Sequence, residues 1–329
     1  MDEQSLQDLK KLRNIQEIID FIRPYYPDLN ITKFKIGEIE KALYHIYIKL
    51  IGKIILFSPM SMRNFLKFYL LKYEIMNIKQ LIIGSIVGLS KKEKSKNINF
   101  LVEEYLENTD FIKKLNELSN LSEIQLLMRR TKYNKAVREG LLYFKNNNEI
   151  FVLEAFLDRL YYENLLKQKK LYNKKESSII NSFINWIIEI YNLKMIYRGI
   201  KNNIEPKILI QFIIHNYHFF NRQELNNLIN LRNVNDFFDE VEAYLRNIES
   251  IKDLTKRIRF KREHFIWSLE GLYQNFFFKK LKIKTDDIDL ITIFRIIELL
   301  IRKDKEIRFD ILPHVINVLN AKYDILELK

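Results

Sequence analysis

Histidine side chains are the first residues of this chain that could do chemistry. The chain has 5 His, and only His215 and His218 are close enough in sequence to bind one metal ion together. A spacing of three residues would place both on one face of a helix, an arrangement that suits zinc. No third ligand of a suitable type follows, because Phe219 and Phe220 come next. Packing or surface positions are the favoured interpretation, and we expect no bound metal.

Three glutamates could supply the carboxylates of an acid–base site. Glu40, Glu154 and Glu270 each follow an apolar residue and each precede an aromatic residue by seven positions. Paired carboxylates at a suitable separation hydrolyse glycosidic bonds, but these three come from distant parts of the chain and would have to converge on one axis. We expect instead that each makes the same interhelical polar contact in its own part of the chain. The sequence therefore predicts no catalytic residue.

Other signs of catalysis or of a bound cofactor are missing from the sequence. There is no Cys, which excludes disulfides, thiolate metal sites and cysteine nucleophiles. No phosphate-binding loop, dinucleotide fingerprint, HExxH motif or nucleophile elbow occurs. We expect an interaction protein that is not an enzyme and that binds no cofactor, metal or nucleotide directly.

A pattern of polar and apolar residues is repeated three times along the chain. Each copy opens with Leu, Asn, an apolar residue and an acid, continues with one of the three glutamates and its aromatic, and ends with a Glu-Ile pair. The openings are Leu12–Glu17, Leu118–Glu123 and Leu231–Asp236, the aromatics are Tyr47, Tyr161 and Phe277, and the pairs begin at Glu74, Glu189 and Glu306. Internal repeats indicate one structural unit per copy. We predict three helical modules, residues 1–117, 118–230 and 231–329.

The first two copies share polar residues as well as apolar ones. Residues 68–84 align without a gap on residues 183–199, with identical Glu, Asn and Lys residues in both stretches. Core periodicity alone would preserve only apolar character, so we interpret the identity as inherited duplication. The candidate site residues are Asn77, Lys79, Asn192, Lys194 and Arg198, with Glu306 and Arg308 in the third copy. They either fix the geometry between helices or face a partner.

Long helices must position these residues. With only 7 Gly and 5 Pro, and 47% hydrophobic residues, the composition favours an all-α fold over strands and tight turns. Each module is predicted to contain an entry helix, a long helix, a basic polar loop and a second long helix. Gly84 and Gly199 are predicted to end the second helix in the left-handed conformation. No stretch reaches the roughly 18 uncharged apolar residues of a membrane span.

Positive charge is the feature of composition that suggests a partner. The formal net charge is +13, which favours an anionic partner such as nucleic acid, lipid headgroups or an acidic protein face. The lysine runs at residues 91–96 and 167–175 fall in predicted loops or helix ends and are interpreted as solvated surface. Residues 256–262 alternate charge with apolar residues and form the candidate contact patch. Its basic members are Lys256, Arg257, Arg259, Lys261 and Arg262.

Two segments of the second copy resemble a known family. The segments Leu153–Tyr162 (LEAFLDRLYY) and Ile190–Gly199 (IYNLKMIYRG) are similar to the C subunit of archaeal and bacterial A/V-type rotary ATPases, which corresponds to the d subunit of eukaryotic V-ATPases. The resemblance extends more weakly from Leu12 to the C-terminus, and it includes Tyr73–Lys79 and Lys305–Arg308.

The resemblance implies a fold and a mechanical function. Members of this family have three similar helical modules arranged as a threefold funnel. They lie on the cytoplasmic face of the membrane proteolipid rotor ring and receive the foot of the shaft, which the D and F subunits form. By resemblance, this chain is a cytoplasmic, membrane-peripheral and non-catalytic central-stalk component that serves ATP synthesis or the transport of protons or other ions.

A basic helical-repeat protein that binds nucleic acid is the alternative. Such a protein would need basic residues at matching positions of all three modules, because a repeat protein binds its ligand through equivalent positions. Only Lys79 and Lys194 recur. Nucleic acid is therefore not the expected partner.

Overall fold

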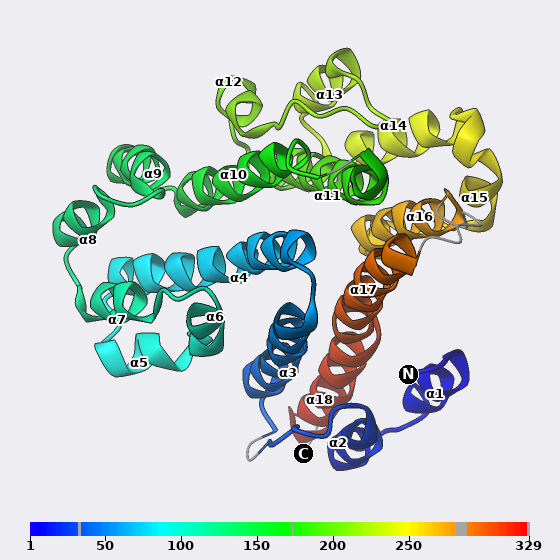
Figure 1. Ribbon diagram of the computed structural model, residues 1–329, viewed down its shortest axis with the longest axis horizontal. Helices are drawn as coiled ribbons and strands as arrows, with labels where there is room; N and C mark the ends of the chain where they lie inside the picture. Colours follow the sequence, from blue (N-terminus) through cyan, green and yellow to red (C-terminus); the bar gives the residue numbers. More distant parts are fainter. Residues whose placement is uncertain (32–33, 173, 281–287, 328–329) are drawn as a thin grey trace. The chain divides into compact units, whose positions relative to one another are not determined.

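Helices account for every regular element in the part of the chain that the structure describes. The structure is a computed structural model, and it describes residues 1–31, 34–172, 174–280 and 288–327. No strand occurs among these residues (Figure 1), so the all-α prediction is confirmed.

The bounds of the helices follow in chain order. The first ten α-helices are α1 (Glu3–Leu9), α2 (Ile15–Ile22), α3 (Ile36–Phe57), α4 (Met60–Ile86), α5 (Lys91–Lys96), α6 (Phe100–Tyr105), α7 (Thr109–Glu117), α8 (Leu121–Met128), α9 (Asn134–Asn147) and α10 (Ile150–Gln168). They are followed by α11 (Lys174–Lys201), α12 (Pro206–Leu209), α13 (Arg222–Ile229), α14 (Val234–Arg246), α15 (Lys252–Arg257), α16 (Phe265–Lys280), α17 (Ile288–Lys305) and α18 (Leu312–Glu327). Short 3₁₀ turns are η1 (Arg23–Tyr25), η2 (Ile210–Phe212), η3 (Glu249–Ile251) and η4 (Arg262–His264), and η5 (Glu306–Ile311) is π-helical.

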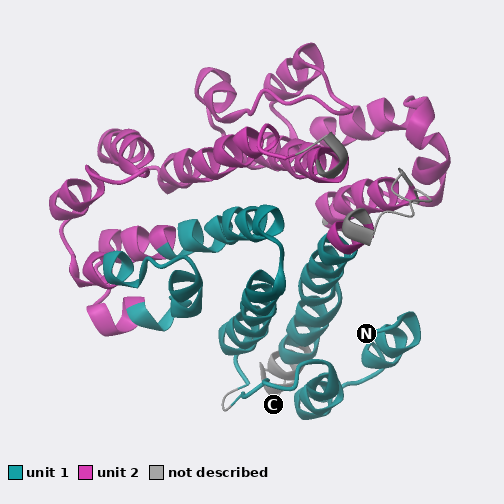
Figure 2. Cartoon of the chain, in the orientation of Figure 1, with its two compact units in different colours: residues 1–77, 95–112, 295–329 teal, residues 78–94, 113–294 magenta. Residues whose placement is uncertain are grey.

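The chain divides into two compact units, which Figure 2 shows in different colours. Unit 1 contains residues 1–77, 95–112 and 295–329, and unit 2 contains residues 78–94 and 113–294. The chain passes from one unit to the other four times, inside α4, α5, α7 and α17. The division into three modules, and the funnel that they would form, stay predictions.

One face of α3 provides the core of unit 1. Its buried residues recur every three or four positions and so form a single stripe along the helix. The stripe consists of Ile39, Leu43, Tyr47, Ile48, Ile51 and Ile55. The hydroxyl of Tyr47 donates to the carbonyl of Leu300 in α17 at 3.1 Å. Gly52 lets α6 approach closely, because a Cβ at this position would lie 1.9 Å from Cζ of Tyr105.

The central helix of unit 2 is α11. It packs against α10, α12, α13, α14 and α16, and a helix with so many neighbours must be apolar around its whole circumference. Its buried apolar residues are Ile179, Ile180, Phe183, Ile184, Trp186, Ile188, Ile190, Tyr191, Leu193, Met195, Ile196 and Ile200. The same helix carries the polar residues Glu189, Asn192 and Lys194.

None of the described helices is both long enough and apolar enough to cross a bilayer.

The asparagine of each repeated opening caps a helix. Asn14, Asn120 and Asn233 are the N-cap residues of α2, α8 and α14, with φ of −116°, −94° and −117° and ψ of 132°, 128° and 133°. Each side-chain oxygen accepts a hydrogen bond from the backbone N–H two residues later, at 2.9, 2.7 and 2.7 Å. Asn is favoured there because it satisfies an N–H that has no partner within the helix. The recurrence of Asn thus reflects the same helix start in each copy.

The two glycines predicted to end helices lie inside them. Both α4 and α11 continue past Gly84 and Gly199, so the predicted left-handed conformation at these residues is wrong. That conformation belongs to Gly88 and Asn203, with φ of 76° and 54°. The carbonyl of each predicted glycine accepts from the N–H five residues later, at 2.7 and 2.9 Å, which closes each helix with a Schellman motif.

Two lysines of the basic runs are withdrawn from solvent, Lys94 being buried and Lys169 half-buried. Residues 91–96 form α5, and the stem of Lys94 crosses Gly84, where an added Cβ would lie 2.8 Å from Lys94 Cγ. Lys94 Nζ donates to the carbonyl of Leu118 at 2.6 Å. Lys169 Nζ donates to the side-chain oxygens of Asn185 and Asn216. Because burial lowers the pKa of both lysines, the interpretation as solvated surface is wrong for them.

The structure describes the connection between the two long helices in the first and second copies, and only the second copy has the predicted basic loop. Ser58 and Pro59 alone connect α3 and α4, so the prediction is wrong for the first copy. Lys169 and Lys170 do lie between α10 and α11 in the second copy. The side chains of Lys174 and Lys175, and residues 281–287 of the third copy, lie outside the described part of the chain.

Candidate functional site

Asn77 and Asn192 make the same pair of hydrogen bonds in two parts of the chain. Asn77 Nδ2 donates to the carbonyl of Asn99 at 3.1 Å, and the Asn99 N–H donates to Asn77 Oδ1 at 3.0 Å. Asn192 bonds both backbone groups of Ile214 in the same way, each at 2.9 Å. The partner stands 22 positions further along the chain in both cases. Both asparagines therefore tie a connecting segment to a long helix.

Buried carboxylates stand at the three repeated Glu-Ile pairs. Glu74, Glu189 and Glu306 are 1%, 0% and 6% exposed. A buried carboxylate costs free energy unless hydrogen-bond donors surround it. Each of the three accepts from a group far away in sequence, and the donor to Glu74 is the side chain of Asn108. The glutamates thus join segments that the chain separates.

Glu189 has the most extensive set of donors. The backbone N–H groups of residues 218, 219 and 220 donate to its carboxylate at 2.8, 2.9 and 3.1 Å. The hydroxyl of Tyr273 in α16 donates to the same carboxylate at 2.6 Å. Burial raises the pKa of Glu189 to about 7, although these hydrogen bonds act to lower it. Glu189 therefore holds α11, α16 and an irregular segment together.

In the third copy, Glu306 and Arg308 lie in the π-helical turn η5 of unit 1. Glu306 accepts a hydrogen bond from the Tyr26 hydroxyl at 2.9 Å and one from the amino group of Met1 at 2.8 Å. Arg308 forms an ion pair with Asp304, one turn earlier, at 2.9 Å. Both predicted residues contact their own chain.

Lys79 and Lys194 both pair with carboxylates of the following sequence copy, within unit 2. Lys79 Nζ lies 2.6 Å from Asp158 and 3.8 Å from Glu154, both in α10. Lys194 Nζ pairs with Glu270 in α16. The repeated glutamates Glu154 and Glu270 thus contact the preceding copy, which the sequence did not predict, and Glu154 also pairs with Arg198 of its own copy.

Arg198 completes the cluster around Glu154. Its Nη2 lies 3.0 Å from the Glu154 carboxylate, and its guanidinium lies 5.0 Å from the ring centroid of Phe151. Glu40, the equivalent residue of the first copy, is exposed. In the third copy, the position five residues after the repeated Glu is the buried Ile311 rather than a lysine. The ion pair between copies thus occurs twice along the described chain.

Residues 256–262, here called the basic segment, lead from the end of α15 to η4. The exposed cations of this segment are Lys256, Arg257, Arg259, Lys261 and Arg262. Arg262 pairs with Asp239, and Lys256 Nζ lies 3.9 Å from Asp253. Phe260 is buried and anchors the segment, with the guanidinium of Arg246 5.8 Å from its ring centroid. The anchored backbone presents the remaining cations to solvent.

The two histidines considered as metal ligands do not share a helix face. His215 and His218 lie in an irregular segment after η2, so the predicted helical spacing is wrong. The His215 ring bonds the hydroxyl of Tyr217 at 2.9 Å, and the His218 ring packs against Phe219. Across the described residues, no three His, Cys, Asp or Glu side chains gather as a metal ion would require.

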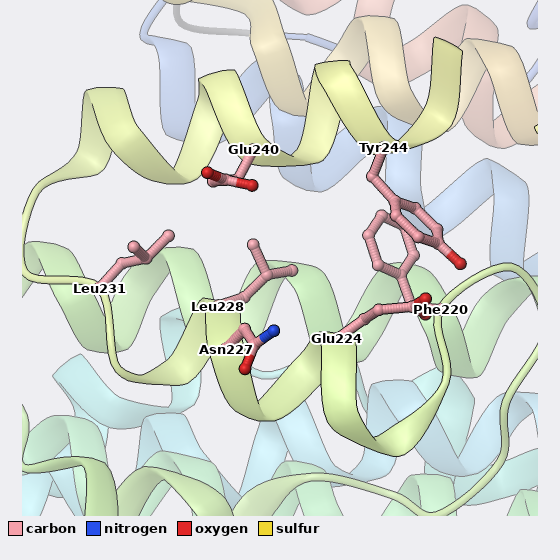
Figure 3. A pocket seen from close by; sticks show the side chains of 7 residues that line it. All are labelled: Phe220, Glu224, Asn227, Leu228, Leu231, Glu240 and Tyr244. Atoms are coloured by element: carbon pink, nitrogen blue, oxygen red, sulfur yellow. The ribbon is translucent and has the colours of Figure 1, made fainter. Parts of the chain in front are cut away.

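A cavity of about 250 Å³ lies between α13 and α14 (Figure 3). Its lining residues are Phe220, Glu224, Asn227, Leu228, Leu231, Glu240 and Tyr244. The carboxylate of Glu224 accepts from the N–H of Asn221 at 2.5 Å as part of a capping box. Burial, together with the hydrogen bond to Glu224, raises the pKa of Tyr244, so this hydroxyl stays protonated.

Sequence reasoning missed an exposed apolar turn. Leu56, Phe57 and Met60, on either side of the Ser58-Pro59 connection, are largely exposed. The signal was present in the sequence, since large apolar residues flank the connection directly and no acidic residue lies nearby.

Comparison with known proteins identifies relatives of a single kind, all C subunits of A-type ATP synthases. The protein from Methanocaldococcus jannaschii is 30% identical over 209 residues, which are 62% of this chain and 50% of that protein. The protein from Methanosphaera stadtmanae is 22% identical over 265 residues, 78% of this chain and 67% of that protein. The protein from Thermococcus kodakarensis is 20% identical over 313 residues, 94% of this chain and 80% of that protein. The chain thus aligns with half the length of the M. jannaschii protein.

A family model matches nearly the whole chain. It is described as the ATP synthase (C/AC39) subunit and covers residues 1–308. The match includes the segments at 153–162 and 190–199 and the repeated polar residues on α4, α11 and η5. The resemblance found in the sequence is confirmed, and the chain belongs to the ATP synthase (C/AC39) subunit family.

Proposed function

We propose that this chain is a non-catalytic central-stalk component of an A/V-type rotary ATPase. It couples the shaft, formed by the D and F subunits, to the membrane proteolipid rotor ring, on the cytoplasmic face of the membrane. The observation that carries this proposal is the family match along residues 1–308. The relatives, which are named as C subunits of A-type ATP synthases, support it. In the same proposal, modules 1–117, 118–230 and 231–329 form a threefold funnel.

The internal contacts support a mechanical role. A coupler must carry torque without deforming, and close-packed helices transmit strain because their interiors have little free volume. Lys79 ties α4 to α10, and Lys194 ties α11 to α16, so successive copies are joined by charge as well as by packing. We propose that Asn77, Lys79, Asn192, Lys194, Arg198, Glu306 and Arg308 fix the geometry between helices. In contrast, the basic segment contacts an anionic partner surface.

The nucleic-acid alternative loses support from the same contacts. Lys79 and Lys194 are the cations that recur between copies, and both pair with carboxylates of the chain itself. A side chain neutralised in this way cannot release counterions from a phosphate backbone. We expect no measurable binding to duplex DNA or RNA at roughly 0.2 M salt, whereas a nucleic-acid binder would show affinity that falls steeply with salt.

Co-purification from native membranes tests the proposed function. The tag belongs at the C-terminal end, because the amino group of Met1 contacts the buried Glu306. The tagged chain, purified in mild detergent, should bring the other components of a rotary ATPase and ATP hydrolysis activity. An untagged preparation is the control. The proposal would be contradicted if the chain were recovered alone and at full yield from membranes that contain intact rotary ATPase complexes.

A further inference from the structure

The connection between α3 and α4 carries an apolar tip, defined here as Leu56, Phe57, Pro59 and Met60. Leu56 is 65% exposed, Phe57 is 88% exposed and Met60 is 67% exposed. Pro59 is exposed as well. Single exposed apolar residues are common on protein surfaces, but here four of five consecutive positions face solvent. A cluster of this kind indicates an interaction surface.

The turn that carries the tip is held firmly. Ser58, between the exposed residues, is buried, and its hydroxyl donates to the carbonyl of Ile54 at 2.7 Å. The backbone N–H of Arg63 donates to the carbonyl of Pro59 at 2.8 Å. Ile55 and Met62, which lie on either side of the tip in sequence, are buried in the core. The tip is therefore presented outward by an anchored backbone and is not a frayed end.

The charged residues next to the tip in the sequence are all basic. No Asp or Glu occurs between Glu40 and Glu74, whereas six Lys and Arg residues do. Among them, Lys49 and Lys67 are paired with acids from other segments. Lys53 and Arg63, one turn to either side of the connection, flank the tip. Apolar residues that have cations on both sides in the sequence match an anionic bilayer, in which acyl chains lie beneath phosphate groups.

We propose that the apolar tip inserts into the headgroup region of an anionic membrane. Leu56, Phe57 and Met60 reach the acyl boundary, and Lys53 and Arg63 meet the lipid phosphates. A helix turn offers far less than the roughly 800 Å² per partner of a standard protein interface, whereas a bilayer can surround it on all sides. Direct lipid contact goes beyond the proposed function, which places the chain against ring and shaft proteins.

Vesicle sedimentation of the full chain tests this contact. The chain should sediment with vesicles of phosphatidylcholine and phosphatidylglycerol and much less with phosphatidylcholine alone. The double variant Leu56→Ser/Phe57→Ser should lower the affinity for the anionic vesicles more than tenfold. The matched control is Leu126→Ser/Leu142→Ser, which changes two leucines of α8 and α9 that are 60% and 56% exposed. The control should bind as the unchanged chain does.

A fluorescent reporter gives a second measurement. Phe57→Trp should shift its emission to the blue when anionic vesicles are added, and Leu126→Trp should not. Absence of binding to anionic vesicles, or equal binding of both double variants, would overturn the proposal. Binding to detergent-solubilised rotor rings but not to vesicles, lost in the tip variant, would also overturn it and assign the tip to a protein. None of these outcomes changes the result expected from co-purification. The lipid contact of the tip and the proposed central-stalk function can therefore be disproved independently.

Discussion

Single polar side chains hold irregular segments of this chain against its long helices. Asn192 satisfies the N–H and the carbonyl of Ile214, and Glu189 satisfies three consecutive N–H groups. A buried backbone group left without a partner costs about 1–3 kcal/mol. These two residues therefore stabilise unit 2 strongly.

Asn192→Ala should lower the free energy of unfolding by roughly 2–3 kcal/mol, because it leaves two backbone groups unpaired in the interior. Urea denaturation followed by circular dichroism measures the change. The matched control is Asn202→Ala, since Asn202 is exposed and bonds only the Arg198 carbonyl. The control should change stability by less than about 0.5 kcal/mol. Equal losses in both variants would contradict this account of Asn192.

Glu189 should make the stability depend on pH. Burial raises its pKa from 4.5 to about 7, so the folded chain binds this proton more tightly than the unfolded chain does. The contribution to the free energy of unfolding is therefore fully present below pH 4.5 and is lost as the pH rises to about 7. Urea denaturation at several pH values should show this loss, and Glu189→Gln should remove it. The exposed control Glu123→Gln should keep this loss. If the free energy of unfolding of Glu189→Gln changed with pH as it does in the unchanged chain, Glu189 would not be the group responsible.

The importance of these residues could be predicted from the sequence, but their partners could not. Polar identity singled out Asn77 and Asn192 but left open whether they fix the geometry between helices or face a partner. Their partners, Asn99 and Ile214, share no residue type, because the bonds are made to backbone groups that every residue carries. Lys94 gave no sign of burial either, since the other lysines of its run, at residues 91, 92 and 96, are exposed.

Close contacts between helices depend on glycine at particular positions. Gly52 is where Tyr105 of α6 packs against the backbone of α3. Gly84 and Gly199 give room to Lys94 and Leu209 in the same way. The prediction that Gly84 and Gly199 end their helices failed because glycine serves equally well as a left-handed cap and as a contact point. The sequence pattern of one helix does not show which neighbour approaches it.

Gly52→Ala should destabilise unit 1, because the new methyl group would overlap the Tyr105 ring and overpacking costs about 1–3 kcal/mol. Gly271→Ala is the matched control within α16, where nothing lies within 4 Å of the added Cβ. The control should stabilise the helix by up to about 1 kcal/mol, since alanine favours helices more than glycine. Thermal unfolding measures the midpoint temperature of each variant, which should fall for Gly52→Ala and not for Gly271→Ala. Similar midpoints for both variants would show that α3 and α6 do not pack as described.

At the scale of the whole molecule, the copies are joined by contacts that differ along the chain. Ion pairs link α4 to α10 and α11 to α16. The third copy has Ile311 at the matching position and instead holds Tyr26 and Met1 through Glu306. Composition predicted the helical class, and the resemblance of residues 153–162 and 190–199 to a known family predicted the family. The sequence could not reveal how copies are joined, since these contacts connect residues more than 70 positions apart.

Charge reversal in the basic segment should weaken association with the rotary complex and leave the fold intact. The triple variant Arg257→Glu/Arg259→Glu/Lys261→Glu changes exposed side chains only. The matched control reverses three exposed lysines elsewhere, Lys145, Lys201 and Lys207. Recovery of partner proteins with the tagged chain should fall severalfold in the first variant and more than in the control. Equal recovery in both variants would remove the basic segment from the interface.

The central claim is that this chain transmits torque and performs no catalysis. The most direct measurement compares ATP hydrolysis with ATP-driven ion pumping in host membranes depleted of the chain. The account predicts that ATP hydrolysis persists while pumping is lost, and that the unchanged chain restores pumping when added back. Pumping at the normal rate per ATP hydrolysed, in membranes that lack the chain, would contradict it.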